Sequence, residues 1–198
     1  MDLGLLYSGG KDSSLAALLL SEFYDVTLVT ASFGITDDWR HAERTAEGTR
    51  FGFRRLELDR SVAEAAVERM YEDGYPRNGV QQVHVHGLES IADEGFDAIA
   101  DGTRRDDRVP SISRAQAQSL EDRHAVDYIA PLSGFGRSAV DRLVEENLSV
   151  EVGPSETIER ADYEAELRAL LEDVAGPEAV TGVFPEHEQS YVTGFRSR

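Results

Sequence analysis

Cysteine is absent from the 198-residue sequence, and lysine occurs only once, at position 11. Without cysteine the chain cannot form disulfides, hold iron–sulfur clusters or thiolate zinc sites, use a cysteine nucleophile or carry a persulfide. The sequence also has no apolar run of about 18 residues and no signal-peptide pattern at its start. We therefore expect a cytoplasmic protein that does not enter a membrane.

Basic residues are scarcer than acidic ones: the sequence has 20 Lys and Arg and 38 Asp and Glu, which gives a net charge of −18. This charge argues against a broad surface for nucleic-acid phosphates, although it allows a local basic pocket. The acidic residues are spread along the chain, and every basic residue except one is arginine. That pattern is typical of halophilic proteins from high-salt cytoplasms, where the Debye length is only about 3 Å at 1 M salt.

Strand-like and helix-like patterns alternate along the chain, which predicts right-handed crossovers and a parallel sheet. The expected strands are Leu3–Tyr7, Val26–Phe33, Arg55–Leu58, Ala98–Ala100 and Tyr128–Leu132. The expected helices are Ser13–Glu22, Asp38–Phe51, Ser61–Asp73, Val80–Glu94, Ser113–His124, Ser138–Asn147 and Thr157–Val174. The predicted class is α/β, with an open, mainly parallel, Rossmann-like five-stranded sheet and helices on both faces. We expect one domain over 1–198, with a core at 1–132 and C-terminal helices plus an edge strand, SYVTGF, at 133–198.

The stretch SGGKDSS, residues 8–14, lies between the first expected strand and the first expected helix. Glycines at such a turn let the backbone approach a ligand, and amides at a helix start favour an anion. Lys11 adds a positive charge, and the serines add hydroxyl donors. The stretch therefore predicts a phosphate site, although it does not fit a Walker A loop.

These residues resemble the SGGxDS signature of the PP-loop superfamily, the N-type ATP pyrophosphatases and adenine nucleotide alpha hydrolases. The resemblance implies an adenine nucleotide alpha hydrolase-like fold, ATP and Mg²⁺ as cofactors, and a catalytic role for Lys11 and Asp12. The residues that it assigns to nucleotide binding in this loop are Ser8, Gly9, Gly10, Lys11, Asp12, Ser13 and Ser14.

A second match lies in DGTRRDDRVP, where several PP-loop enzymes carry Gly-Thr followed by an acid. The resemblance places Gly102, Thr103 and Arg104 at the nucleotide, with Arg105 and Arg108 as alternative phosphate or substrate contacts. A carboxylate beside a triphosphate needs a metal between them. Asp12, together with Asp106 or Asp107, is therefore a candidate Mg²⁺ ligand, and the last two are also catalytic candidates.

The superfamily holds adenine largely with backbone groups after the second strand, which implies Ala31, Ser32 and Phe33 here, with Phe33 also suited to the core. The resemblance covers residues 3 to about 132. Outside this range, two roles fit Arg137 at the start of an expected helix: a contact at the nucleotide site or a position on the surface. His84 and His86 are weak metal candidates, because residues i and i+2 of a helix point to different faces.

Two classes of function remain open. An enzyme would adenylate a substrate and release pyrophosphate, and the sequence resembles a small archaeal group described as a predicted PP-loop subunit of a tRNA thiolation enzyme. With no cysteine and a charge of −18, such a chain needs a partner that brings sulfur and RNA contacts. The alternative is a non-catalytic ATP- or AMP-binding module of the universal-stress-protein type. The substrate and the oligomeric state, homo-oligomer included, stay open.

Overall fold

The computed structural model describes residues 1–154, 161–185 and 188–196. Its centre is a five-stranded sheet of β1 (Asp2–Leu6), β2 (Asp25–Ser32), β3 (Gly52–Glu57), β4 (Ala98–Ala100) and β5 (Asp127–Ile129). The strand order is β3-β2-β1-β4-β5, and every pairing is parallel. Leu5 is central, because it pairs with Leu28 on one side and Ala100 on the other. The predicted parallel α/β sheet is confirmed.

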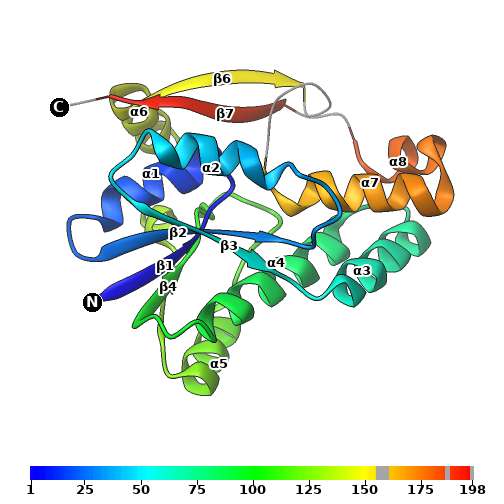
Figure 1. Ribbon diagram of the computed structural model, residues 1–198, viewed down its shortest axis with the longest axis horizontal. Coiled ribbons are helices and arrows are strands. Elements are labelled where there is room, and N and C mark those ends of the chain that lie inside the picture. Colours follow the sequence, from blue (N-terminus) through cyan, green and yellow to red (C-terminus); the bar gives the residue numbers. More distant parts are fainter. Residues whose placement is uncertain (155–160, 186–187, 197–198) are drawn as a thin grey trace.

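Helices cover both faces of this sheet (Figure 1). They are α1 (Lys11–Leu20), α2 (Trp39–Glu47), α3 (Arg60–Asp73), α4 (Arg77–Ala92), α5 (Arg114–His124), α6 (Arg137–Asn147), α7 (Tyr163–Ala175) and α8 (Pro177–Val183). Leu3 and Leu5 pack with Ala16 and Ala17 of α1 on one face. On the other face Ile99 packs with Leu88 of α4. Successive side chains of a strand point to opposite faces, so a sheet with helices on both faces has buried side chains on both.

The strand order reverses direction at β1, whose neighbours are β2 on one side and β4 on the other. The chain therefore leaves β1 and β4 toward opposite faces at the same edge of the sheet. In open α/β sheets the crevice at such a switch point is where ligands bind. The loops after β1 and β4 contain SGGKDSS and GTRRDD, so the topology brings the two sequence motifs together.

The C-terminal part differs from the prediction. SYVTGF does not extend the main sheet: it lies in β7 (Glu188–Phe195), which pairs antiparallel with β6 (Leu148–Pro154) in a separate two-stranded sheet. The expected strand Tyr128–Leu132 already ends at Ile129, because Pro131 opens a 3₁₀ turn, Pro131–Gly134, and disfavours continued pairing. With only three residues, β5 offers little for a further strand to pair with at that edge of the sheet.

The last helical region also differs. The helix expected over 157–174 begins at Tyr163 and is capped by Asp162, whose side chain accepts from Ala165 N, while residues 157–160 lie outside the described residues. Gly176, with φ of +83°, then separates α7 from α8, a short helix that the sequence pattern did not predict. A left-handed glycine followed by proline ends one helix and starts another.

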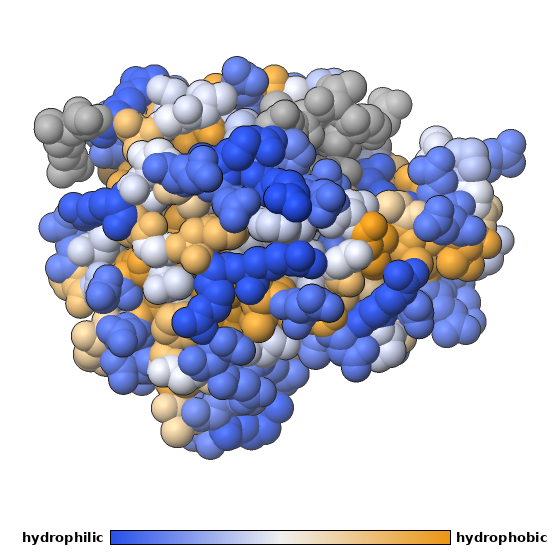
Figure 2. All heavy atoms as spheres, viewed as in Figure 1, coloured by the Kyte–Doolittle hydropathy of each residue, from blue (hydrophilic) through white to orange (hydrophobic). Residues whose placement is uncertain are grey.

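The visible surface is mainly hydrophilic (Figure 2). Hydrophilic side chains cover much of the face in Figure 2, with apolar atoms in small areas between them. Across residues 1–154, 161–185 and 188–196, every helix falls short of the length and apolarity that a bilayer crossing demands.

Candidate functional site

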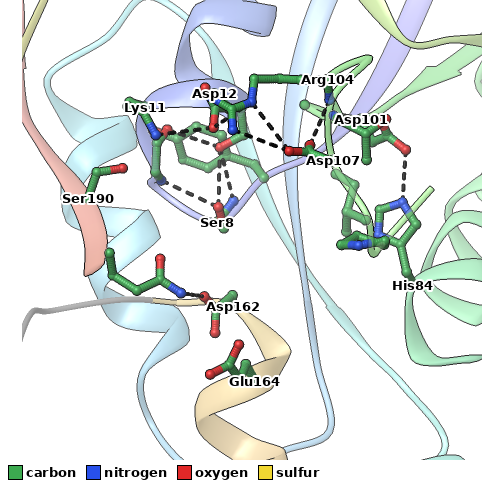
Figure 3. Close-up of a pocket in the computed structure, with 18 of the residues that line it drawn as sticks. Ser8, Lys11, Asp12, His84, Asp101, Arg104, Asp107, Asp162, Glu164 and Ser190 are labelled. Carbon is green, nitrogen blue, oxygen red and sulfur yellow. Dashed lines mark hydrogen bonds and ion pairs between the residues drawn. The ribbon is translucent and has the colours of Figure 1, made fainter. Parts of the chain in front are cut away.

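A cavity of about 630 Å³ opens at the carboxyl ends of β1 and β4. Its walls come mainly from the loop after β1, the loop after β4, the start of α7 and the strand β7, with further residues from β2, α4, α6 and β6. Figure 3 shows Ser8, Lys11 and Asp12 on one side of it and His84 and Asp101 on another. The volume is in the range of small-molecule sites in proteins.

The loop after β1 turns at Gly9, whose φ of +76° favours glycine. Gly10 is the N-cap of α1, and no described side chain caps this helix. Ser13 Oγ instead closes the loop, since it accepts from Ser8 N at 3.4 Å and donates to Gly10 O at 3.2 Å. The uncapped amide end of α1 thus lies at the cavity wall, where helix dipole and amides favour an anion.

Strand β7 supports this loop from outside the main sheet. Val192 N donates to Gly9 O at 3.1 Å, and Thr45 Oγ1 of α2 donates to Val192 O at 3.4 Å. Gln189 and Ser190, just before, line the cavity. The position of the first loop therefore depends on a strand that follows it by about 180 residues.

Lys11 and Asp12 occupy the first turn of α1. Lys11 Nζ lies 3.3 Å from Asp12 Oδ2, and Arg104 Nε lies 3.9 Å from the same oxygen. Asp12 Oδ1 is buried and has no hydrogen-bond partner among the described residues. Because a buried carboxylate oxygen without a donor is costly, this atom is suited to a cation or a ligand donor.

Arg104 is held by carboxylates of its own loop. Asp107 accepts from Arg104 N at 2.7 Å and from its guanidinium at 3.3 Å, and Asp106 lies 3.8 Å from Arg104 Nε. Partial burial opposes the charge, but Asp12, Asp107 and Asp106 together raise the pKa of Arg104 above its ordinary value. Arg104 is therefore a permanent cation at the cavity, flanked by acids that compensate it.

Gly102 is packed directly against the start of α1. A Cβ at this position would lie 2.7 Å from Ser13 N and 2.8 Å from Ser13 Cα, both backbone atoms. Only glycine allows this approach of the two loops. Gly102 thus joins the two sequence motifs by a close backbone contact.

Asp101, 1% exposed, is the centre of a buried hydrogen-bond network. It accepts from Thr103 N at 2.9 Å, from Thr103 Oγ1 at 2.6 Å and from Tyr128 Oη at 2.9 Å. Its remaining partner is His84 Nε2, at 2.8 Å. Burial alone would raise the pKa of Asp101, but the hydrogen bond and electrostatic attraction of His84 and the two hydrogen bonds from Thr103 bring it below its usual value. Asp101 is therefore ionised at neutral pH.

Glu166 of α7 caps the end of β2. Its carboxylate accepts from Ser32 Oγ at 3.1 Å, from Phe33 N at 2.9 Å and from Ile35 N at 2.9 Å, and the side chain is buried. The amide that adenine would use at Phe33 is thus already occupied. Phe33 itself lies in the core with Leu167.

Replacement of Glu166 by alanine is expected to lower the free energy of unfolding by about 2 kcal/mol, because two backbone N–H groups and a hydroxyl lose a buried acceptor. Urea unfolding measures the change. Glu172→Ala, an exposed position of the same helix, is the matched control and should stay within about 0.5 kcal/mol of the parent protein. Equal stability of the two variants would contradict a capping role.

The cavity brings together most of the residues predicted from the sequence. Those that line it are Ser8, Gly10, Lys11, Asp12, Ser13, Ala31, Gly102, Thr103, Arg104, Asp107 and Arg137. Four others lie behind this wall: Gly9 in the turn, Ser14 against Tyr7 Oη at 3.2 Å, and Ser32 and Phe33 at Glu166. Asp106 is exposed beside Arg104, Arg105 and Arg108 are exposed as well, and none of these three nor His86 lines the cavity.

A metal site is not preassembled. Within the described ranges, no three His, Asp or Glu side chains are grouped so that they could hold a metal ion. Asp12 and Asp107 approach the cavity, but Arg104 lies between their carboxylates. A cation bound here would need ligands that a phosphate chain supplies.

The sequence pattern did not point to three residues of this region: Asp101, the carboxylate cap Glu166, and Tyr163, which lines the cavity with its Oη 2.7 Å from His84 Nδ1. The helical pattern suggests only a weak metal role for His84, whereas this side chain is 3% exposed and hydrogen-bonded to Asp101. One signal was available, since Asp101 directly precedes the Gly-Thr motif at the end of a buried strand.

Comparison with known proteins gives relatives of nearly full length. The crystal structure described as a predicted subunit of tRNA methyltransferase from Methanocaldococcus jannaschii superimposes with a TM-score of 0.90 at 41% identity, covering 100% of this chain and 99% of that one. A protein of the same organism, described only as uncharacterized protein MJ0690, is 42% identical over 197 residues, which are 99% of this chain and 97% of the relative. Residues 1–194 match the family of unknown function DUF7411. The chain therefore belongs to the DUF7411 family.

Proposed function

We propose that this protein binds ATP in the 630 Å³ cavity and adenylates a substrate with release of pyrophosphate. The observation that carries the proposal is the uncapped start of α1, which meets the cavity at Lys11, the only lysine of the chain. Backbone amides, helix dipole and an ammonium group at one place favour the β- and γ-phosphates. The resemblance of residues 8–13 to the SGGxDS signature supports the same assignment.

The residues around the loop suit the reaction. Lys11 and Arg104 supply positive charge where negative charge would gather on the leaving pyrophosphate, so the site would act by positioning and charge stabilisation. Asp12, with its unpartnered buried oxygen, and Asp107 would hold Mg²⁺ together with phosphate oxygens. Such an ion supplies Lewis-acid stabilisation of the phosphoryl oxygens. Asp106 would act only indirectly, by its ion pair with Arg104.

The adenine would lie toward the end of β2, where Ala31 lines the cavity. Because Phe33 N donates to Glu166, we assign recognition of the ring to the backbone at Ala31 rather than at Phe33. Ser32 would contribute only through its place in the strand, since its hydroxyl donates to Glu166 as well.

A setting in tRNA modification is the second part of the proposal. The M. jannaschii structure is described as a predicted tRNA methyltransferase subunit, whereas the sequence resemblance pointed to a thiolation subunit. Both descriptions concern tRNA and both name a subunit. With a net charge of −18, this chain would rely on a partner protein for most RNA contacts.

Binding of Mg·ATP is expected to raise the melting temperature by about 5–10 °C when the ligand exceeds its Kd about 100-fold. Differential scanning calorimetry in molar KCl measures the shift, with Mg·GTP and S-adenosylmethionine as comparison ligands. Products are then followed by ³¹P NMR, where AMP and pyrophosphate are expected.

Three other outcomes would each reject a part of the proposal. ADP with phosphate would point to a kinase or ATPase reaction, and a larger shift with S-adenosylmethionine would point to methyl transfer. Binding of Mg·ATP with no product in the presence of total tRNA and cell extract would favour the non-catalytic binding module.

A further inference from the structure

A chain of hydrogen bonds runs from the cavity wall into the sheet. Tyr163 Oη lies 2.7 Å from His84 Nδ1, and His84 Nε2 lies 2.8 Å from Asp101 Oδ2. All three residues line the cavity, and they come from α7, α4 and the end of β4. Figure 3 shows the contact between His84 and Asp101, across the cavity from Ser8 and Lys11. The phosphate loop and this hydrogen-bond chain thus border one space.

The carboxylate of Asp101 determines where the protons lie. An ionised carboxylate only accepts, so its bond with His84 requires a hydrogen on His84 Nε2. In the neutral imidazole, Nδ1 is then the acceptor, and its partner is the hydroxyl of Tyr163. The geometry therefore orients the chain as Asp101 carboxylate, His84 imidazole and Tyr163 hydroxyl.

Tyr163 keeps its own proton in this state. Burial, first of all, and the charges of Asp162, Asp101 and Glu164 raise its pKa well above the usual value for tyrosine. The hydroxyl hydrogen points to His84, so the oxygen lone pairs remain available to a donor in the cavity. A bound group with an O–H or N–H bond would satisfy them.

We propose that Tyr163, His84 and Asp101 form a proton relay that deprotonates an acceptor bearing a hydroxyl or amine group. The inference rests on the proposed function, because the acceptor attacks the bound nucleotide, and it extends that function to a class of acceptor. It excludes acceptors that attack through an oxygen without a proton, such as a carboxylate.

With a hydroxyl group or water as the acceptor, the reaction forms one bond at phosphorus and breaks another. The acceptor's oxygen forms a bond to the α-phosphorus, and the bond from this phosphorus to the bridging oxygen breaks. Pyrophosphate leaves with the electron pair. The acceptor's proton passes to Tyr163 Oη as the Tyr163 proton passes to His84 Nδ1, and the resulting imidazolium is stabilised by Asp101.

The test uses water as the acceptor and the full chain with Mg·ATP, with AMP formation as the measured rate. Tyr163→Phe and His84→Gln are each expected to lower this rate by about 10²-fold, at the lower end of general-base effects. The glutamine amide retains a donor for Asp101 but cannot take up a proton, so a merely structural histidine would be rescued by it. His86→Gln, two residues further along α4 and lining a separate surface hollow beside Glu89, is the matched control.

A spectroscopic measurement accompanies the rates. In ¹⁵N-labelled protein, the resonances lost in His84→Gln should show protonated Nε2 and unprotonated Nδ1 in the parent chain. The shift produced by Mg·ATP on the melting temperature should persist in both relay variants.

The outcomes distinguish failure of the proposed function from failure of the relay alone. If the parent chain forms no AMP with water, and none when total tRNA and cell extract are added, the proposed function fails and the relay fails with it. If the parent forms AMP and either variant does so within a factor of about two, the relay is wrong while the proposed function stands. A protonated Nδ1 at neutral pH would also overturn the relay, whatever the rates.

Discussion

Exchange of Lys11 for arginine is expected to lower the rate of AMP formation by about 10²- to 10³-fold, the scale seen when a transition-state donor is removed. Lys11 is 28% exposed and 3.3 Å from Asp12 Oδ2 at the start of α1. A compact ammonium fits between this carboxylate, the glycine backbone and a phosphate chain, whereas a guanidinium is planar and wide. The melting temperature of the free protein should stay unchanged, because the side chain supports no packing in the core.

The control is the opposite substitution, arginine to lysine, at a surface position. Arg142→Lys replaces a guanidinium that is 79% exposed and bonded to Glu146, and it should leave the rate unaltered. A rate for Lys11→Arg within a factor of about two of the parent chain, which is under about 0.5 kcal/mol, would remove Lys11 from the reaction.

Substitution of Gly102 by alanine is expected to weaken Mg·ATP binding by about 10²-fold and to lower the free energy of unfolding by about 1–3 kcal/mol. The added Cβ would lie 2.7 Å from Ser13 N and 2.9 Å from Asp12 C, and backbone atoms cannot move aside as a flexible side chain can. The start of α1 must shift, and overpacking of this kind is destabilising. Calorimetric titration with the α,β-methylene analogue of ATP gives the affinity, and urea unfolding gives the stability.

Gly134→Ala is the matched control for Gly102. Apart from its own turn and chain neighbours, no described atom lies within 4 Å of where an alanine Cβ would be at Gly134, so alanine there should change neither quantity by much. Loss of stability at Gly102 with unaltered affinity would show that the contact with Ser13 serves the fold alone.

The sequence predicted those features that depend on neighbours along the chain. The strands of the main sheet alternate with helices at local spacings, and SGGKDSS is a contiguous turn after an apolar run, so both are visible as patterns. The Gly-Thr motif follows a buried strand for the same reason. Their convergence also follows, because parallel strands end at one edge of the sheet.

Features that depend on distant contacts could not be predicted in this way. His84 and Tyr163 are separated by 79 positions, and Glu166 lies 133 positions from Phe33, whose amide it accepts from. Nothing in the local pattern fixes where α7 packs or which partner β7 takes. The several glutamates of this helix predict a solvated face, and only the packing of α7 against the end of β2 buries Glu166.

The bond between Val192 and Gly9 has a consequence for biosynthesis. The loop after β1 is synthesised about 180 residues before its supporting strand, β7 (Glu188–Phe195). At about 5–20 residues per second this interval is roughly 10 s or longer. A nascent chain can form β1 and α1 before β7 is synthesised, yet the loop between them gains its support only when β7 follows.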